Sequence, residues 1–276
     1  MTTSDGGIHC TGVMHLYPGD ENPVVALRNV DLDIGPGELV AILGPSGSGK
    51  STLLALLSGM LRATAGSVIV AGHDLGQLTP GTLRRLRRSE FGLLLQDPME
   101  NLIPYATARQ NVEFAQTGVG RTSGSSGTDV LAELQIGGIA DRPVSELSGG
   151  EQQRVALATV LATSPTVLLA DEPTAHLDPE GRDAVVAGLR SANRIGGTTT
   201  VIVTHDPAVA EALPRTITID NGQVGSEGRD GREFVVVGKD GSIHLPADVL
   251  TTHPAGTLFT LRRTPSGLEL HSEERE

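Results

Sequence analysis

"GPSGSGKST", residues 44–52, follows the apolar run "LVAIL" (39–43) and precedes the helix-like run "LLALLSGML". A strand, a glycine-rich turn of the form G-x-x-x-x-G-K-[ST] and a helix, in this order, are typical of a loop that binds phosphate groups. The glycines let successive backbone N–H groups point inward and hold an anion. We expect Lys50 to bridge β- and γ-phosphates, Ser51 to supply a Mg²⁺ ligand and Thr52 to support the α- and β-phosphates. The alternative is a glycine-rich turn with a structural role alone.

A second motif, "VLLADEP" (167–173), ends a buried strand with two acids. In open α/β sheets, ligands bind at the carboxyl ends of the strands. Asp171 is therefore predicted to hold Mg²⁺ through water, and Glu172 to act as general base on the attacking water. The alternative is a pair of acids that only lies on the surface.

The composition narrows the class of protein. The 276 residues include 21 Lys and Arg against 33 Asp and Glu, a net charge of −12, which disfavours nucleic acid and anionic lipid as direct partners. A single cysteine, Cys10, excludes an internal disulfide and fits a reducing cytosol. The sequence shows no apolar run of the roughly 20 residues that a membrane helix needs, and no secretory signal is expected from its N-terminus. We therefore expect any membrane role to run through a separate partner.

Short β-branched runs recur between helical stretches, and we interpret them as buried parallel strands of an α/β domain. They are "ELVAIL" (38–43), "SVIVAG" (67–72), "FGLLLQ" (91–96), "TVLLAD" (166–171) and "TTTVIVT" (198–204). Residues 117–129, rich in Gly and Ser, predict a mobile loop inside a mostly helical insert. "LRRLRR" (83–88) predicts a helix with a leucine stripe and a solvated arginine face; a nucleic-acid patch is the alternative.

"LSGGE" (147–151) puts two glycines where a helix should begin. A bare helix start exposes unpaired backbone N–H groups and the positive end of the helix dipole, which together favour an anion. Gly149 and Gly150 would let this backbone approach the anion closely. The residues alone do not say which anion this is.

Together these motifs resemble those of the ATP-binding cassette (ABC) ATPases, over residues 8 to about 226. Gln96 in "LLLQDP" resembles the Q-loop of that family, "TAHLD" (174–178) its D-loop, and His205 in "VIVTHD" its switch histidine. The surrounding sequence looks most like the lipoprotein-release and macrolide-exporter group. The resemblance implies an α/β fold of the P-loop NTPase class, with a RecA-like core, an antiparallel β subdomain and an α-helical signature subdomain.

The resemblance also implies a role for each matching residue. Residues implied to bind nucleotide are Tyr17, Gly44, Pro45, Ser46, Gly47, Ser48, Gly49, Lys50, Ser51, Thr52, Ser148, Gly149, Gly150 and Asp178; those implied to act in catalysis are Lys50, Gln96, Glu172 and His205; those implied to hold Mg²⁺ are Ser51, Gln96 and Asp171.

In this family two subunits pack head to tail, and the signature helix of one caps the γ-phosphate of the ATP held by the other. Ser148, Gly149 and Gly150 would thus act on the partner's nucleotide, and Asp178 would steady the facing phosphate loop. Tyr17 would stack on adenine, with a core-lining tyrosine as the alternative. His205 would contact the γ-phosphate, with a structural histidine as the alternative.

Two positions depart from the family pattern. Thr159 stands where an arginine is usual, and His176 stands in the D-loop where small residues or asparagine are common. Neither departure removes a catalytic group.

The implied function is that of an Mg²⁺-dependent ATPase subunit that dimerises around two ATP and drives a membrane permease encoded separately, in export or mechanotransmission. Such a protein would lie in the cytoplasm, peripheral to the inner face of the cell membrane. One alternative is a cell-division ABC ATPase that transmits force without cargo. Another is a soluble ABC ATPase of DNA repair or translation, although such proteins usually carry a long coiled-coil insertion or two cassettes. A P-loop kinase outside the family would lack "LSGGE" and the switch histidine.

We expect two domains, an ABC ATPase domain over residues 1–228 and a small unit over 229–276. In the second, "REFVVVGKDGSIHLP" predicts strand, turn and strand, "ADVLTTH" a short helix, and "GTLFTLRRTPSGLELH" a second hairpin. This β-β-α-β-β order is similar to the swapped-hairpin folds of the AbrB type, which leads us to expect that the unit dimerises.

Overall fold

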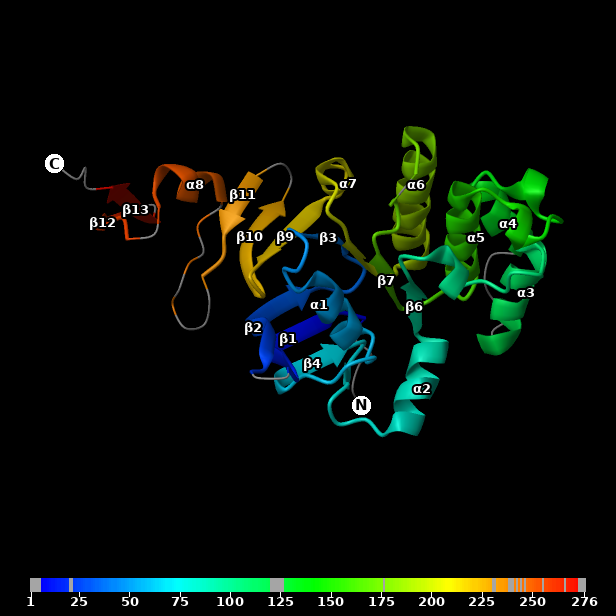
Figure 1. The fold of residues 1–276 in the computed structure, drawn as a ribbon, viewed down its shortest axis with the longest axis horizontal. Helices are drawn as coiled ribbons and strands as arrows, with labels where there is room; N and C mark the ends of the chain where they lie inside the picture. Colours follow the sequence, from blue (N-terminus) through cyan, green and yellow to red (C-terminus); the bar gives the residue numbers. More distant parts are fainter. Residues whose placement is uncertain are drawn as a thin grey trace.

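The computed structural model describes residues 6–19, 22–119, 127–175, 177–229, 232–237, 247–254, 256–265 and 267–272, with 241, 243 and 245. A seven-stranded sheet lies at its centre, in the order β11-β10-β9-β3-β8-β7-β6 (Figure 1). Strands β3, β6, β7, β8 and β9 run parallel, and β10 and β11 complete one edge in antiparallel pairing. The strands are β3 (Leu39–Leu43), β6 (Phe91–Leu94), β7 (Val167–Asp171), β8 (Thr199–Val203), β9 (Arg215–Asp220), β10 (Gln223–Arg229) and β11 (Arg232–Val235).

The parallel strands are apolar on both faces because each face packs against its own core. In β7, Leu168 and Ala170 join one cluster, whereas Val167 and Leu169 join the other. The first cluster includes side chains of α5 (Gly149–Leu161) and α6 (Pro179–Gly196), and the second those of α1 (Lys50–Leu57). Alternate residues of a strand point to opposite faces, so a strand covered on both sides reads as a continuous apolar run.

A second, four-stranded sheet is antiparallel, in the order β2-β1-β4-β5. It consists of β1 (Ile8–Tyr17), β2 (Val24–Ile34), β4 (Ala65–Val70) and β5 (His73–Asp74). The interpretation of "SVIVAG" as a parallel strand is therefore wrong, because β4 pairs antiparallel with β1. Its burial alternates, with Val68 and Val70 in the core, as expected of a strand covered on one face.

Whereas the short α7 (Pro207–Glu211) contacts β3 and β9, several of the remaining helices form a subdomain beside β6 and β7, at the right of Figure 1. Its elements, with the helix that leads into it, are α2 (Pro80–Ser89), α3 (Ala108–Val119), α4 (Gly127–Glu133) and α5, with 3₁₀ turns at Pro98–Glu100, Gly137–Ile139 and Val144–Glu146. In α2, Leu83 and Leu86 are buried and the four arginines are exposed, which confirms the expected leucine stripe. The predicted loop at 117–129 is shorter at both ends, since α3 reaches Val119 and α4 begins at Gly127; its middle lies outside the described residues.

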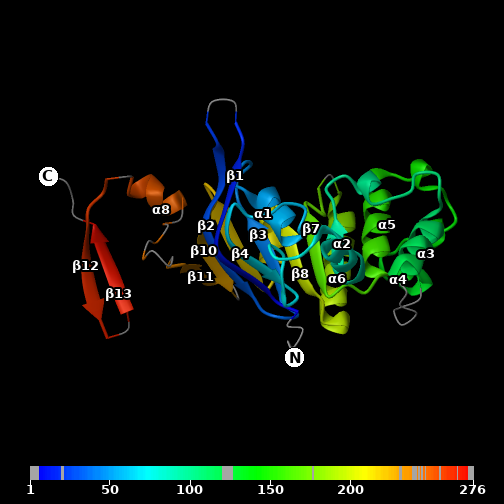
Figure 2. The same cartoon turned by 90° about the horizontal axis from the view of Figure 1, so that it is seen from below.

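The C-terminal segment contains α8 (Ala247–Thr252) and a hairpin of β12 (Phe259–Thr264) and β13 (Gly267–Ser272), as expected. In the described residues, an antiparallel bridge from Val237 to Ile243 joins the two stretches of the first predicted hairpin. Its first strand, β11, also pairs with β10 and so extends the central sheet, which the sequence did not predict. α8 and the β12–β13 hairpin stand beyond β11, apart from the body, in both ribbon views (Figures 1 and 2).

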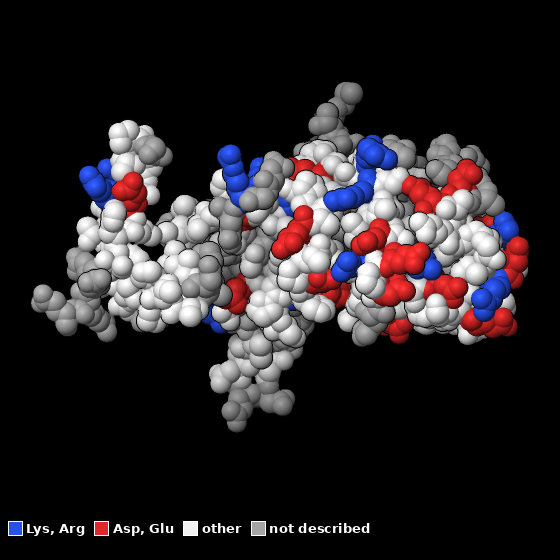
Figure 3. Space-filling model, turned by 90° about the horizontal axis from the view of Figure 1, so that it is seen from above, with Lys and Arg blue, Asp and Glu red and all other residues white. Residues whose placement is uncertain are grey.

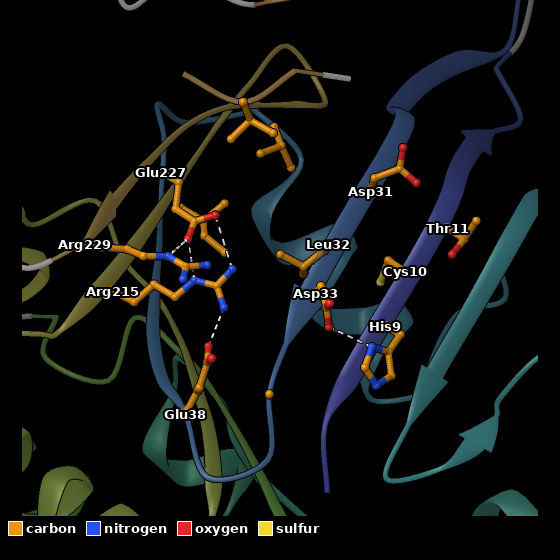
Figure 4. A pocket seen from close by; sticks show the side chains of 14 residues that line it. His9, Cys10, Thr11, Asp31, Leu32, Asp33, Glu38, Arg215, Glu227 and Arg229 are labelled. Carbon is orange, nitrogen blue, oxygen red and sulfur yellow. Dashed lines mark hydrogen bonds and ion pairs between the residues drawn. The ribbon is translucent and has the colours of Figure 1, made fainter. Parts of the chain in front are cut away.

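The two large sheets approach each other around a cavity of 580 Å³, and charged pairs connect the strands on either side (Figure 4). Arg215 of β9 forms ion pairs with Glu227 of β10, at 2.8 Å, and with Glu38, the residue before β3. Across the cavity, His9 of β1 lies 2.8 Å from Asp33 of β2. Burial raises the pKa of Glu227, but hydrogen bonds from Arg215 and Arg229 outweigh it, so the pKa lies below its ordinary value. The two ion pairs of Arg215 connect β9 and β10 to Glu38, directly before the strand that leads into the phosphate loop.

No helix in the described part of the chain is long and apolar enough to span a bilayer.

Candidate active site

A cleft of 810 Å³ opens at the carboxyl ends of β3, β7 and β8, beside strands β1 and β2 of the antiparallel sheet. It collects most of the residues singled out in the sequence, although they come from widely separated segments. Its lining consists of Tyr17, Val24, Val25, Ala26, Pro45, Ser46, Gly47, Gly49, Lys50, Ser51, Thr52, Gln96, Asp171, Glu172 and His205. Gly44 and Ser48 belong to the same loop without lining the cleft.

The loop from Gly44 to Gly49 is shaped by steric constraints from its neighbours. A Cβ on Gly44 would lie 2.1 Å from the carbonyl oxygen of Ile219, and a Cβ on Gly49 would lie 2.6 Å from that of Ala26. Gly49 also has a φ of 101°, which side-chain-bearing residues rarely adopt. Lys50 bends back over the loop, and its Nζ donates to the carbonyl oxygens of Gly44 and Pro45, each at 2.8 Å. Its ammonium group is thereby held at the mouth of the loop.

The turn between β9 and β10 fixes the outer side of this loop. The amide of Gly222 donates to the carbonyl oxygen of Ser48 at 3.0 Å, and the carbonyl oxygen of Gly222 accepts from the amide of Arg28 at 2.8 Å. One glycine thus connects the phosphate loop to the antiparallel sheet.

The acidic pair stands opposite the loop, at the end of β7. Burial raises the pKa of the Asp171 carboxyl above its ordinary range; a hydrogen bond from Ser51 opposes this shift, and the charge of Glu172 adds to it. Glu172 has a φ of 46°, uncommon for a residue with a side chain, and its amide donates to the carbonyl oxygen of Val203 at 2.8 Å. Both carboxylates line the same cleft.

Glu172 and His205 form a close pair. Nδ1 of His205 lies 2.8 Å from Oε1 of Glu172, and the Glu172 side chain is 12% exposed while that of His205 is 70% exposed. The carboxylate is therefore shielded, and the imidazole faces the open cleft. Such a pair can polarise a water molecule and move a proton between the acid and the ring.

The aromatic side of the cleft comes from the end of β1. The hydroxyl of Tyr17 lies 3.3 Å from Oγ1 of Thr52, and its ring packs edge-on against His15, with centroids 4.7 Å apart. Val24, Val25 and Ala26 at the start of β2 provide an apolar wall that the sequence analysis missed. These small residues form no motif, and only their neighbourhood to Tyr17 in the folded sheet reveals them.

The signature segment lies outside this cleft. Ser148 caps α5: its Oγ accepts from the amide of Glu151 at 3.3 Å, and its own amide donates to Oε2 of Glu151 at 2.8 Å. The amide and the hydroxyl of Ser148 both donate to Oε2 of Glu151, and these hydrogen bonds lower the pKa of Glu151. A Cβ on Gly149 would meet no atom within 4 Å, and a Cβ on Gly150 would come within only 3.4 Å of Leu177. Neither the packing nor the φ of Gly149 requires a glycine within its own chain.

The other family positions have local structural partners. Asp178 also lies outside the cleft and caps α6, with its Oδ1 accepting from the amide of Gly181 at 2.8 Å. The hydroxyl of Thr159 donates to the carbonyl oxygen of Val155 at 2.9 Å, within α5. His176 lies outside the described residues.

The cleft contains donors suited to a nucleotide and a hard cation. Ser51, Gln96 and Asp171 offer a hydroxyl, an amide oxygen and a carboxylate, the oxygen ligands that Mg²⁺ prefers together with phosphate oxygens. Backbone amides at the start of α1 and the charge of Lys50 suit a polyphosphate.

Over residues 27–175 the sequence matches the family described as ABC transporter. The chain belongs to the ABC transporter family. Among its relatives, the lipoprotein-releasing system ATP-binding protein LolD 1 of Caulobacter vibrioides is 37% identical over 231 residues, which are 82% of this chain and 98% of that protein. The macrolide export ATP-binding/permease protein MacB of Salmonella typhimurium is 41% identical over 215 residues, 77% of this chain and 33% of that protein. The ABC chain thus spans a third of the MacB relative.

Solved ABC cassettes share the fold. A dimeric bacterial ABC transporter cassette is 36% identical, with a TM-score of 0.74 over 82% of this chain and 100% of the other. A dimeric cassette in a post-hydrolysis state, bound to ADP and Pi, is 35% identical with the same TM-score and the same coverage. The predicted family, fold class and ATP-hydrolysing activity are therefore confirmed: this ABC chain is an ATP-binding, ATP-hydrolysing transporter subunit.

Proposed function

We propose that two copies of the chain sandwich two ATP molecules, each held between the Lys50 loop of one copy and the Ser148 helix start of the other. The observation that carries this proposal is the open space around Gly149. Within its own chain, neither steric contacts nor the backbone conformation require a glycine at position 149. The close approach of a phosphate bound by another copy of the chain would explain why this residue is a glycine. The dimeric state of solved relatives agrees with this arrangement.

Within each site, we assign ATP hydrolysis to residues that line the 810 Å³ cleft. Lys50 and the loop amides bind the β- and γ-phosphates, and Thr52 and Tyr17 lie beside each other on the side we assign to the α-phosphate and the base. Ser51, Gln96 and Asp171 would hold Mg²⁺, which neutralises charge on the phosphates. Glu172 accepts the proton of the attacking water, and His205, hydrogen-bonded to it, orients that carboxylate and faces the γ-phosphate.

In our proposal, ATP hydrolysis drives a membrane permease on a separate chain. The ABC subunit would then be peripheral to the membrane. LolD and MacB relatives belong to lipoprotein-release and macrolide-export systems, and these are the transport classes that we favour. A second hollow, of 530 Å³, begins at Gln96 and Asp171 and continues along Asp97 to Glu100. Tyr105 and Phe114 are exposed on the adjoining helical subdomain. The segment from Gln96 to Glu100 leads from the residues assigned to Mg²⁺ toward the chain segment of the helical subdomain, and it is suited to couple hydrolysis to a partner protein.

Surface charge argues against the alternative role in DNA repair or translation. Carboxylates are spread over the helical side of the molecule in the face drawn in Figure 3, with basic side chains between them. With a net charge of −12, such a surface repels nucleic acid.

The proposal predicts distinct effects of two substitutions. Glu172→Gln should lower kcat by about 10²- to 10⁴-fold, the usual contribution of a general base, while ATP binding persists. With ATP the variant should accumulate as a dimer, measured by light scattering after size exclusion on a chain that ends after Val237 and so lacks the C-terminal hairpin of β12 and β13. Adding Gly149→Asp should abolish this ATP-dependent dimer, because a carboxylate at the helix start repels the partner's γ-phosphate.

Gly81→Asp in the same Glu172→Gln background is the matched control. Gly81 also lies in the first turn of a helix with open space around its Cβ, so an aspartate should be equally compatible with folding at both sites. An ATP-dependent dimer that survives Gly149→Asp would refute the sandwich.

A further inference from the structure

The β12–β13 ribbon has one apolar and one polar face. Its register pairs Leu261 with Leu270 and Arg263 with Leu268, so these side chains share a face together with Phe259. The opposite face carries the pairs Thr260–His271 and Arg262–Glu269. A ribbon with this alternation is built to lie against something apolar.

Nothing in the described part of the chain covers that apolar face. Leu261 is 53% exposed, Leu268 66% and Leu270 41%. The strands pack extensively only against each other, and the one ring contact to the preceding segment joins Phe259 to His253, with centroids 5.3 Å apart. A two-stranded hairpin without further packing is marginally stable in water. The ribbon therefore needs a partner surface to hold its fold.

We propose that this partner is the same face of a second copy of the chain. Place one ribbon face to face with another, related by a two-fold axis that crosses the strands at Leu261 and Leu270. Each of these leucines then meets its own counterpart, and Arg263 of each copy lies over Phe259 of the other. The face contains no acid, so an aromatic ring is the group that can receive the Arg263 cation. Leu268 of each copy then lies over Ser272 of the other, so no like charges meet across the two-fold axis.

Charge also favours a second copy over a lipid surface. Residues 229–276 carry six Lys and Arg against eight Asp and Glu, a net charge of −2, so two copies meet there with little repulsion although the whole chain carries −12. A ribbon that dips into an anionic membrane would present several cations at the rim of its apolar face. Here Arg263 is the one cation on that face, and Arg262 lies on the other, opposite Glu269.

The first test is self-association of the full chain without nucleotide, by sedimentation velocity over a range of concentrations. The wild type should be dimeric, and Leu261→Glu/Leu270→Glu should weaken self-association at least about ten-fold. Thr260→Glu/His271→Glu adds the same formal charge on the opposite face and should leave the dimer intact. A wild type that stays monomeric at every concentration, or a dimer that survives the leucine double variant, would overturn the proposal.

Two further measurements separate this interface from the others. With Glu172→Gln and ATP, the leucine double variant should still dimerise through its cassettes, which also establishes that it is folded. A leucine double variant that is folded by circular dichroism but monomeric with ATP, beside a Thr260→Glu/His271→Glu variant that is dimeric without ATP, would instead point to failure of the nucleotide sandwich. Leu261→Cys should be crosslinked between copies by a short bis-maleimide without ATP, and Arg262→Cys should not. The native Cys10 will not compete, because burial raises its pKa to about 12. Binding to phosphatidylglycerol vesicles that is lost in the leucine double variant, without a dimer in the wild type, would refute self-association and assign the face to membrane.

Discussion

The body and the C-terminal segment of this ABC chain differ in how far their apolar side chains are buried. Among the described residues, every buried core side chain lies at or before Ile219. From Phe234 onward the large apolar residues are mostly exposed, including Val237, Leu258 and Leu268. The body has completed its cores within one chain, whereas the C-terminal segment has the alternating pattern of a sheet without the surface to complete it. Sequence patterns of the same kind can thus describe a finished domain or half of an interface.

The largest expected difference concerns a leucine in each region. Leu157 of α5 is fully buried, so Leu157→Ala should lower the free energy of unfolding by about 2–5 kcal/mol through lost contacts and a cavity. Leu268→Ala should change the main unfolding transition by less than about 0.5 kcal/mol, because its side chain is exposed within one chain. Chemical denaturation with ATP absent measures both. Equal losses in the two variants would mean that the ribbon folds as part of the body.

A slightly smaller effect on the free energy of unfolding is expected at the charged cavity that lies between the two sheets. Arg215→Gln removes the buried cation that Glu38 and Glu227 share and leaves Glu227 with the more exposed Arg229, so it should cost about 3 kcal/mol at pH 7, near the lower end for a broken buried ion pair. Arg229→Gln is the control: Arg229 pairs with the same Glu227 but is more than half exposed, so its loss should cost less than about 1 kcal/mol.

The cost of Arg215→Gln should also depend on pH. The folded-state pKa of Glu227 lies below its ordinary value of 4.5, so the stabilisation is fully present above pH 4.5 and is lost as the pH falls through the folded-state pKa. Thermal unfolding measured from pH 7 downward should therefore show the wild type and Arg215→Gln converging in acid. A difference in melting temperature that stays constant below pH 4.5 would contradict this role of the ion pair.

The smallest expected effect on stability tests whether the peripheral helix α2 unfolds together with the rest of the body. The hydroxyl of Thr79 accepts from the amide of Thr82 at 3.2 Å and caps α2, a helix at the periphery held by Leu83 and Leu86. Thr79→Ala should lower the stability of the main transition by about 1 kcal/mol. Arg84→Ala, on the exposed face of the same helix, should leave it unchanged. If the cap variant also has no effect on the main transition, α2 opens separately and the body is smaller than drawn here.

Local patterns made the central part of the fold predictable. The phosphate loop needs a strand, a helix and small residues within a short stretch, and Gly44 and Gly49 meet that need against Ile219 and Ala26. The family, the fold class and the ATPase activity follow from such motifs. The roles of individual site residues, including Glu172 and Ser148, stay predictions that the substitutions above test.

The errors in the sequence analysis share one cause, which is that strand pairing is not local. The runs that became β4 and β7 look alike, yet one is covered on a single face in an antiparallel sheet and the other on both faces in a parallel one. β11 was assigned to a separate hairpin, because its pairing with β10 depends on where the central sheet ends. The apolar wall of Val24 to Ala26 was missed because no spacing rule relates it to Tyr17.

The position of β11 matters for anyone who shortens this protein. A chain that ends at residue 228, the boundary expected from the sequence, would lose β11 and expose the backbone of β10 along the rim of the central sheet. Strands of other molecules can pair with an exposed edge of this kind, which promotes aggregation. Ending the chain after Val237 keeps the four residues Arg232–Val235 as a guard strand and removes only α8 and the ribbon.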